Sequence, residues 1–169
     1  MKTFKKILFA SLILLFTISC KKDDLPAATQ EGKNIMAAKV NGKTWVKTAC
    51  WSCIGAGGGL NVSYENGILS IRGEQFVSKT NDNVIGILIQ NPKIGDNIVD
   101  GSRINLEYND YGNKKYYKTY SNSIGVVNIT KIDTIKKIIS GTFHFDAVNE
   151  NDLNDTVSIT DGRFDVTYN

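Results

Sequence analysis

Residues 137–147 read KIISGTFHFDA, and this stretch decides how the chain folds. Apolar or small residues occupy every second position, and polar residues occupy most positions between them. Because the side chains of a β-strand point alternately to opposite faces, this period of two predicts a strand with one buried face. The residues expected on that face are Ile139, Gly141, Phe143, Phe145 and Ala147. His144 then lies on the opposite face, away from both phenylalanine rings.

The same period runs outward through nearly all of the chain after Cys20. Asn-Gly pairs at 41–42 and 66–67 supply the positive φ angles of hairpin turns, and Asp161-Gly162 is expected to close a last hairpin. Residues 92–101 are expected to form a long connection. The predicted strands cover residues 36–40, 43–48, 60–64, 69–71, 85–89, 104–108, 116–120, 125–132, 137–147, 156–160 and 163–168. About ten such strands predict an all-β domain, either an antiparallel β-sandwich or a partly closed β-barrel.

The N-terminus has the pattern of an export signal. Three lysines and no acidic residue precede an apolar run over residues 7–18, which is shorter than the roughly 20 residues that span a bilayer. The run ends in TISC at residues 17–20, which resembles a bacterial lipobox. That resemblance implies that residues 1–19 are a lipoprotein signal peptide and that Cys20 is lipidated, which anchors the protein to a membrane.

The residues after Cys20 suggest where the anchor goes. Lys22, Asp23 and Asp24 resemble the lipoprotein export signal of Bacteroidota, which implies an outer-membrane protein that faces the cell exterior. The remaining residues up to 34 are aperiodic. We expect residues 20–34 to hold the lipidated cysteine and a flexible tether, and residues 35–169 to form one domain.

Charge and composition exclude one class of partner. Removal of residues 1–19 takes three lysines with it, so the formal charge of +3 falls to about zero. A neutral domain has no general electrostatic attraction for nucleic acid, so we expect no nucleic-acid partner.

Four stretches carry a family resemblance: AAKVNGKTW, GVVNITKID, ISGTFHFDA and ITDGRFDVTYN. They are similar to those of small outer-membrane lipoproteins of Bacteroidota with a β-rich domain of unknown function. The resemblance covers most of residues 35–169 and implies a surface lipoprotein. It carries over no catalytic or ligand-binding residue.

Cys50 and Cys53 are the two cysteines left once Cys20 is lipidated. A C-x-x-C pair serves in thioredoxin-like redox enzymes, but that chemistry needs a helix, and the glycines at 57–59 oppose one. A zinc site would need two further ligands, and the chain has a single histidine. We therefore expect a local disulfide at a tight turn, with free thiols as the alternative.

Five tyrosines gather around one predicted loop with three lysines between them. Their rings offer flat apolar faces and hydrogen-bonding tips, which suit a glycan or a protein partner at the cell surface, although some could instead pack in the sheet. The candidate ligand-binding residues are Tyr108, Tyr111, Tyr116, Tyr117 and Tyr120. His144 lacks a nucleophile partner, and residues 149–155 fail the spacing of a calcium loop, so we expect no catalytic residue, metal or cofactor.

These observations favour a surface lipoprotein whose β domain binds a ligand or has a structural role, and which is not an enzyme. The alternative is a lipocalin-like barrel that carries a small apolar ligand, and an enzyme of unknown type comes third.

Overall fold

A computed structural model describes residues 25–49, 58–78 and 81–169, and these residues form strands and connections only. The predicted all-β fold is confirmed, with eleven strands in one antiparallel sheet. No helix among the described residues is long and apolar enough to cross a membrane. The strands are β1 (Ile35–Val40), β2 (Lys43–Val46), β3 (Leu60–Glu65), β4 (Ile68–Ser78), β5 (Asn81–Gln90), β6 (Gly95–Ile98), β7 (Ile104–Asp110), β8 (Lys115–Lys118), β9 (Gly125–Asp133), β10 (Ile138–Asn149) and β11 (Asp152–Thr167).

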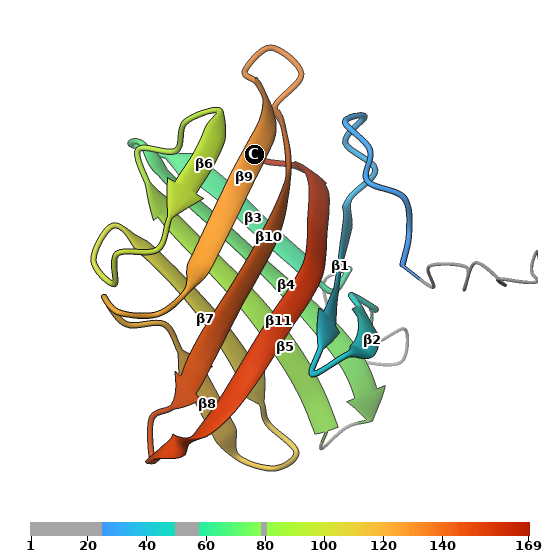
Figure 1. Cartoon of the computed structure of the whole chain (residues 1–169). Helices are drawn as coiled ribbons and strands as arrows, with labels where there is room; N and C mark the ends of the chain where they lie inside the picture. The colour runs from blue at the N-terminus through green and yellow to red at the C-terminus, as the bar shows by residue number, and fades with distance from the viewer. Residues whose placement is uncertain (1–24, 50–57, 79–80) are drawn as a thin grey trace, which may run out of the picture.

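The sheet folds over on itself into two layers. Its strand order is β2-β1-β11-β10-β8-β7-β5-β4-β3, and β9 pairs with both β10 and β6. Strand β10 joins the layers, because its first part pairs with β9 and its last two residues pair with β8. In Figure 1, strands β6, β9, β10 and β11 form the front layer, and β3, β4, β5 and β7 cross behind them. The sheet is not closed, which fits a sandwich or an open barrel.

Both Asn-Gly turns form as predicted. Asn41 and Gly42 have φ angles of 48° and 77°, and Asn66 and Gly67 have φ angles of 51° and 75°. Asparagine and glycine tolerate this left-handed region better than other residues, so each pair can join two strands within two residues.

Two local predictions are wrong. Asp161-Gly162 does not end a strand, because β11 continues through it from Asp152 to Thr167. Asp161 has a φ of 52°, and the pairing with β10 shifts there, so the pair forms a β-bulge. The connection over residues 92–101 also contains a strand, β6, which pairs with β9. A polar strand of four residues has too little alternation to be recognised in the sequence.

The space between the layers is filled by side chains. The alternation seen in residues 137–147 is confirmed, because Ile139, Phe143, Phe145 and Ala147 are buried and His144 is exposed. Trp45 packs into the same core from β2. Other large side chains buried to more than 98% include Phe164, Met36, Leu69, Ile71, Ile85, Ile87, Ile89, Leu106, Ile129 and Ile159.

Residues 25–34, which we expected to belong to a flexible tether, lie against β11. The buried carboxylate of Asp165 holds them: it accepts hydrogen bonds from Thr29 Oγ1 at 2.6 Å and from the amides of Glu31, Gly32 and Lys33 at 2.8–3.1 Å. Leu25 is buried as well. We call residues 25–34 the strap.

A fifth donor completes the environment of Asp165. The hydroxyl of Ser140, on β10, donates to its Oδ1 at 2.7 Å. Burial by itself raises the pKa of a carboxyl, but these donors outweigh burial and hold the pKa of Asp165 well below its usual range. The sequence did not reveal this docking because the donors are mostly backbone amides, which any residue carries.

Candidate functional site

The outer face of β4, β5, β7 and β8 carries a groove with a volume of about 330 Å³. One row of paired positions crosses it from strand to strand. Arg72 pairs with Gly86, Gly86 pairs with Glu107, and Glu107 pairs with Lys118. Side chains on one face of neighbouring strands lie about 5 Å apart, so this row brings two cations and a carboxylate together over a glycine.

Gly86 makes the floor of the groove. A Cβ atom at this position would lie 2.6 Å from Cγ and Oε1 of Glu107, so the carboxylate lies directly over the glycine backbone. In this position Glu107 forms an ion pair across β5 with Arg72, whose Nη1 lies 3.5 Å from Glu107 Oε1. The missing side chain therefore allows an ion pair to form flat against the sheet.

Two tyrosines lie beside the groove: Tyr111 contacts Arg72, which lines the groove, and Tyr116 packs against Tyr111. Nη2 of Arg72 donates to the hydroxyl of Tyr111 at 3.1 Å, so this pair bridges over β5 from β4 to the end of β7. The ring of Tyr111 meets the ring of Tyr116 edge to face, with their centroids 5.8 Å apart. Tyr111 is exposed and Tyr116 is half-buried, so part of each ring remains open to solvent.

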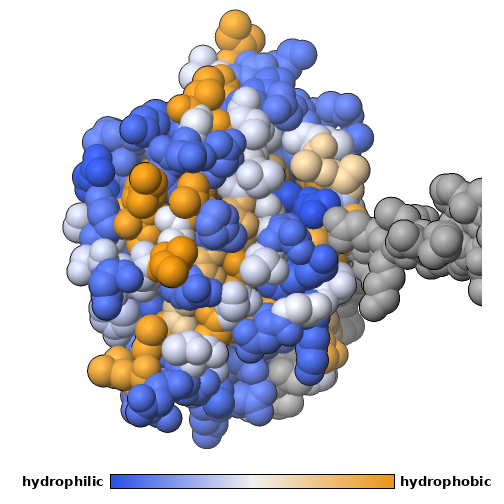
Figure 2. All heavy atoms as spheres, in the orientation of Figure 1, coloured by the Kyte–Doolittle hydropathy of each residue, from blue (hydrophilic) through white to orange (hydrophobic). Residues whose placement is uncertain are grey.

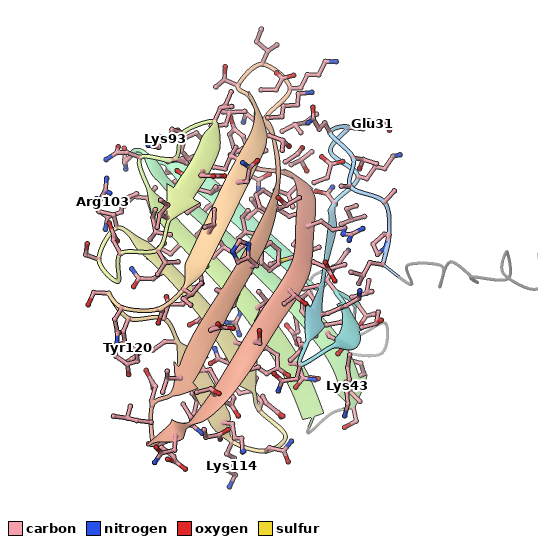
Figure 3. All side chains as sticks on the ribbon, in the orientation of Figure 1. Glu31, Lys43, Lys93, Arg103, Lys114 and Tyr120 are labelled. Atoms are coloured by element: carbon pink, nitrogen blue, oxygen red, sulfur yellow. The ribbon has the colours of Figure 1, made fainter. Side chains whose placement is uncertain are left out.

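Lys118 and Tyr120 extend the site along β8. The Lys118 ammonium pairs with Glu150 and lies 5.4 Å from the centroid of the Tyr120 ring. The hydrogen bond to Glu150 raises the pKa of Lys118 above its usual value, so this side chain stays charged at neutral pH. Figure 3 labels Lys114, in the loop between β7 and β8, at the lower end of the molecule, and Tyr120 higher up on the left side.

The structure separates the five candidate tyrosines into two groups. Tyr108 and Tyr117 point into the core, where they are 7% and 6% exposed and their ring centroids lie 5.9 Å apart. Burial raises the pKa of Tyr108 to about 12. Tyr116 lies on the outer face of β8, while Tyr111 follows β7 and Tyr120 follows β8, and all three are at least partly exposed. The candidate ligand-binding set therefore reduces to these three outer tyrosines.

Comparison with protein families supplies the identity of the domain. The family model described as a domain of unknown function, DUF6252, matches residues 33–166. The chain belongs to this family. The match confirms the predicted resemblance to a domain of unknown function over residues 33–166. Neither the curated proteins nor the solved structures include a match to the chain.

Several predicted site residues lie outside the described part of the DUF6252 protein. They are Cys20, Lys22, Asp23, Asp24, Cys50 and Cys53. Lipidation, the export signal and the disulfide therefore stay predictions.

The remaining candidates lie apart from the groove. His144 is exposed on the outer face of β10, in the other layer. In residues 149–155, the carboxylate of Asp155 accepts hydrogen bonds from Lys115, Tyr117 and Asn149. Within the described residues, no group of three or more histidine, cysteine, aspartate or glutamate side chains is placed to hold a metal.

The sequence patterns did not identify three residues of the groove: Arg72, Gly86 and Glu107. They are far apart in the chain, and only the antiparallel register of β4, β5 and β7 aligns them. The one usable hint was Gly86, a glycine among the isoleucines of β5, because a glycine within a strand often marks a close approach.

The chemistry of the groove is that of binding. Arg72, Lys118 and Asn105 donate hydrogen bonds, Glu107 accepts them, and the outer tyrosines offer aromatic faces. Each charged group already has a partner, so a ligand must compete by matching the hydrogen-bond pattern and not by charge alone.

Proposed function

We propose that this DUF6252 protein is a lipid-anchored protein of the outer membrane that faces the cell exterior and binds a glycan through the groove on β4, β5, β7 and β8. The anchor is the lipidated Cys20, and Lys22, Asp23 and Asp24 direct export to the surface. The domain acts as a binding module and not as an enzyme. Support for the location at the cell surface comes from the sequence, and support for the binding role comes from the groove.

One observation carries the binding role: the row Arg72–Gly86–Glu107–Lys118 lines the groove, and the Tyr111 hydroxyl contacts Arg72 at its side. The Tyr116 ring packs against Tyr111. Sugars present apolar C–H faces and rings of hydroxyl groups. Aromatic side chains match the first feature, and paired donors and acceptors match the second. Gly86 lets the Glu107 carboxylate lie flat against the sheet, where hydroxyl groups of a ligand in the groove can donate to it.

The alternative function, transport of a small apolar ligand inside a barrel, has less support. Such a ligand needs an internal cavity, and the described layers pack Trp45, Phe145 and Phe164 between them. The grooves found among the described residues open to the surface.

Binding can be tested on an array of bacterial and host polysaccharides. The wild-type protein should be retained on a subset of the glycans. Tyr111→Ala should lose at least tenfold in affinity, and Tyr111→Phe should lose less, because it keeps the ring and removes only the hydroxyl bonded to Arg72.

Arginine variants give a matched control. Arg72→Ala should weaken binding, whereas Arg103→Ala should not, although Arg103 is also exposed and paired with a carboxylate, at 2.9 Å from Asp100. Thermal melts should agree among all variants. Absence of wild-type binding to any glycan, or equal effects of the two arginine variants, would reject the glycan site.

The anchor is tested separately. Cys20→Ala should move the protein from the detergent phase to the aqueous phase after detergent partitioning of cells. A variant that still fractionates with membranes would contradict lipidation.

A further inference from the structure

One end of the domain carries an exposed isoleucine on each of two connections. Ile135 lies between β9 and β10 and is 94% exposed, and Ile94 lies before β6 and is 66% exposed. Turns favour glycine, asparagine, aspartate and proline, and side chains this exposed contribute little to the core. Figure 2 shows apolar atoms at the top of the molecule, above the β9–β10 connection.

The strand register places both connections at the same end. Gly95 pairs with Ile129 on β9, four residues before Asp133, where that strand ends. Lys131 donates to the carbonyl of Gln30 at 3.0 Å, so the strap reaches this end as well. Figure 3 labels Lys93 and Glu31 in the upper part of the molecule, and Lys43 and Lys114 in the lower part.

Each isoleucine has lysine neighbours that no carboxylate neutralises. Lys93, Lys136 and Lys137 form no ion pair among the described residues, whereas nearby Lys33 pairs with Glu31 and Lys131 pairs with Asp133. Asp133 also accepts a hydrogen bond from the backbone of Lys136. Asp96 and Glu65 at this end also form no ion pair among the described residues, so the excess positive charge is local, at Lys136 and Lys137 beside Ile135. Lysines next to an exposed apolar side chain are the pattern of a surface that rests on anionic lipid.

The strap limits which end a membrane anchor can bring to the bilayer. Nη1 of Arg163 donates to the carbonyl of Pro26 at 3.0 Å, which fixes Pro26 beside β11. Even fully extended, the six residue steps from Cys20 to Pro26 span at most about 21 Å. Along β11, the end at Thr167 is about 13 Å from Arg163 and the end at Asp152 is about 36 Å away. Of the two ends of β11, only the Thr167 end lies within this span, and Ile135 belongs to the connection just before Ile138, which pairs with Thr167.

We propose that this end of the domain rests on the membrane that holds the anchor, with Ile135 and Ile94 in the lipid interface and Lys93, Lys136 and Lys137 against anionic headgroups. The inference rests on the proposed lipidation of Cys20. It directs the opposite end, with the β7–β8 loop, away from the membrane.

Tryptophan variants of the full-length lipidated protein test the contact. Ile135→Trp places a fluorophore at the proposed interface, and Leu153→Trp is the matched control, since Leu153 is a 70% exposed residue near the β10–β11 turn at the other end. Each protein is reconstituted in vesicles of phosphatidylglycerol and phosphatidylcholine with brominated acyl chains. Wild-type protein supplies the background from Trp45 and Trp51.

The tryptophan at position 135 should shift its emission to the blue and be quenched at least twofold more than the tryptophan at position 153. Adding Lys136→Glu and Lys137→Glu to Ile135→Trp should reverse most of that quenching. Protein that floats with the vesicles but shows equal quenching at both positions would overturn this inference and leave the anchor intact. Protein that does not float would overturn the anchor and this inference together.

Discussion

Replacing Asp165 by asparagine should destabilise the domain and release the strap. The carboxylate accepts five hydrogen bonds, two at Oδ1 from Gly32 and Ser140, and three at Oδ2 from Thr29, Glu31 and Lys33. An asparagine has the same shape but must place an NH₂ group where one of these oxygens stood. The variant therefore tests the acceptors without creating a cavity.

The cost follows from the geometry. The better orientation puts the new NH₂ at the Oδ1 position, because the Ser140 hydroxyl can turn to accept from it. The Gly32 amide is then left without an acceptor, which costs about 1–3 kcal/mol. The three bonds at Oδ2 lose their charge assistance, at roughly 0.5–1 kcal/mol each. We expect a loss of about 3–5 kcal/mol in the free energy of unfolding and a drop of roughly 10 °C in melting temperature.

Urea unfolding of wild type and Asp165→Asn measures this loss, with Asp161→Asn as the control. Asp161 lies on the same strand, but its side chain is 49% exposed and pairs with Lys39 at the surface, so its substitution should cost less than about 1 kcal/mol. Trypsin should cut after Lys33 faster in Asp165→Asn only. If Asp165→Asn unfolds within about 1 kcal/mol of wild type, the carboxylate does not hold the strap.

The pH dependence provides a second check. Because the pKa of Asp165 is lower in the folded protein than in the unfolded chain, its stabilisation is fully present above the unfolded value of about 4. It is lost as the pH falls through the folded value. The difference in stability between wild type and Asp165→Asn should therefore be constant near neutral pH and shrink below about pH 4.

Three further predictions concern the bulge, the cysteines and the export signal. Gly162→Ala should lower the free energy of unfolding by about 2–4 kcal/mol, because a Cβ there would lie 2.5 Å from the ring and carbonyl oxygen of the phenylalanine that pairs with it. Gly58→Ala is the control: its Cβ meets no atom within 4 Å, so it should be close to neutral in urea unfolding. Mass spectrometry should find Cys50 and Cys53 joined, with the unreduced protein two hydrogens lighter than the reduced form. An insulin-reduction assay should show no turnover. Free thiols or turnover would contradict a structural disulfide. Protease shaving of intact cells should remove the wild-type domain and spare a variant with alanine at residues 22–24, and equal shaving of both would argue against an export signal.

Local patterns in the sequence were enough to predict the fold class and most of the strands. The period of two in residues 137–147 predicted β10 and its buried face, and the Asn-Gly pairs predicted two hairpins at the correct residues. These features depend on interactions between near neighbours in the chain: alternation of side chains along a strand, and the backbone preferences of asparagine and glycine. Such interactions act in any tertiary context, so one sequence is enough to reveal them.

Which distant residues come into contact depends on how the strands pair in three dimensions. Asp161-Gly162 could close a hairpin or form a bulge, and the pairing of β11 with both β1 and β10 selected the bulge. Pairing across strands also aligned Arg72 with Glu107 over Gly86 and turned Tyr108 and Tyr117 inward. The strap docked because a buried carboxylate on β11 needs donors, and backbone amides of residues 31–33 provide most of them. Contacts of this kind join residues that are distant in sequence, and their energy depends on burial and register, which no local pattern records.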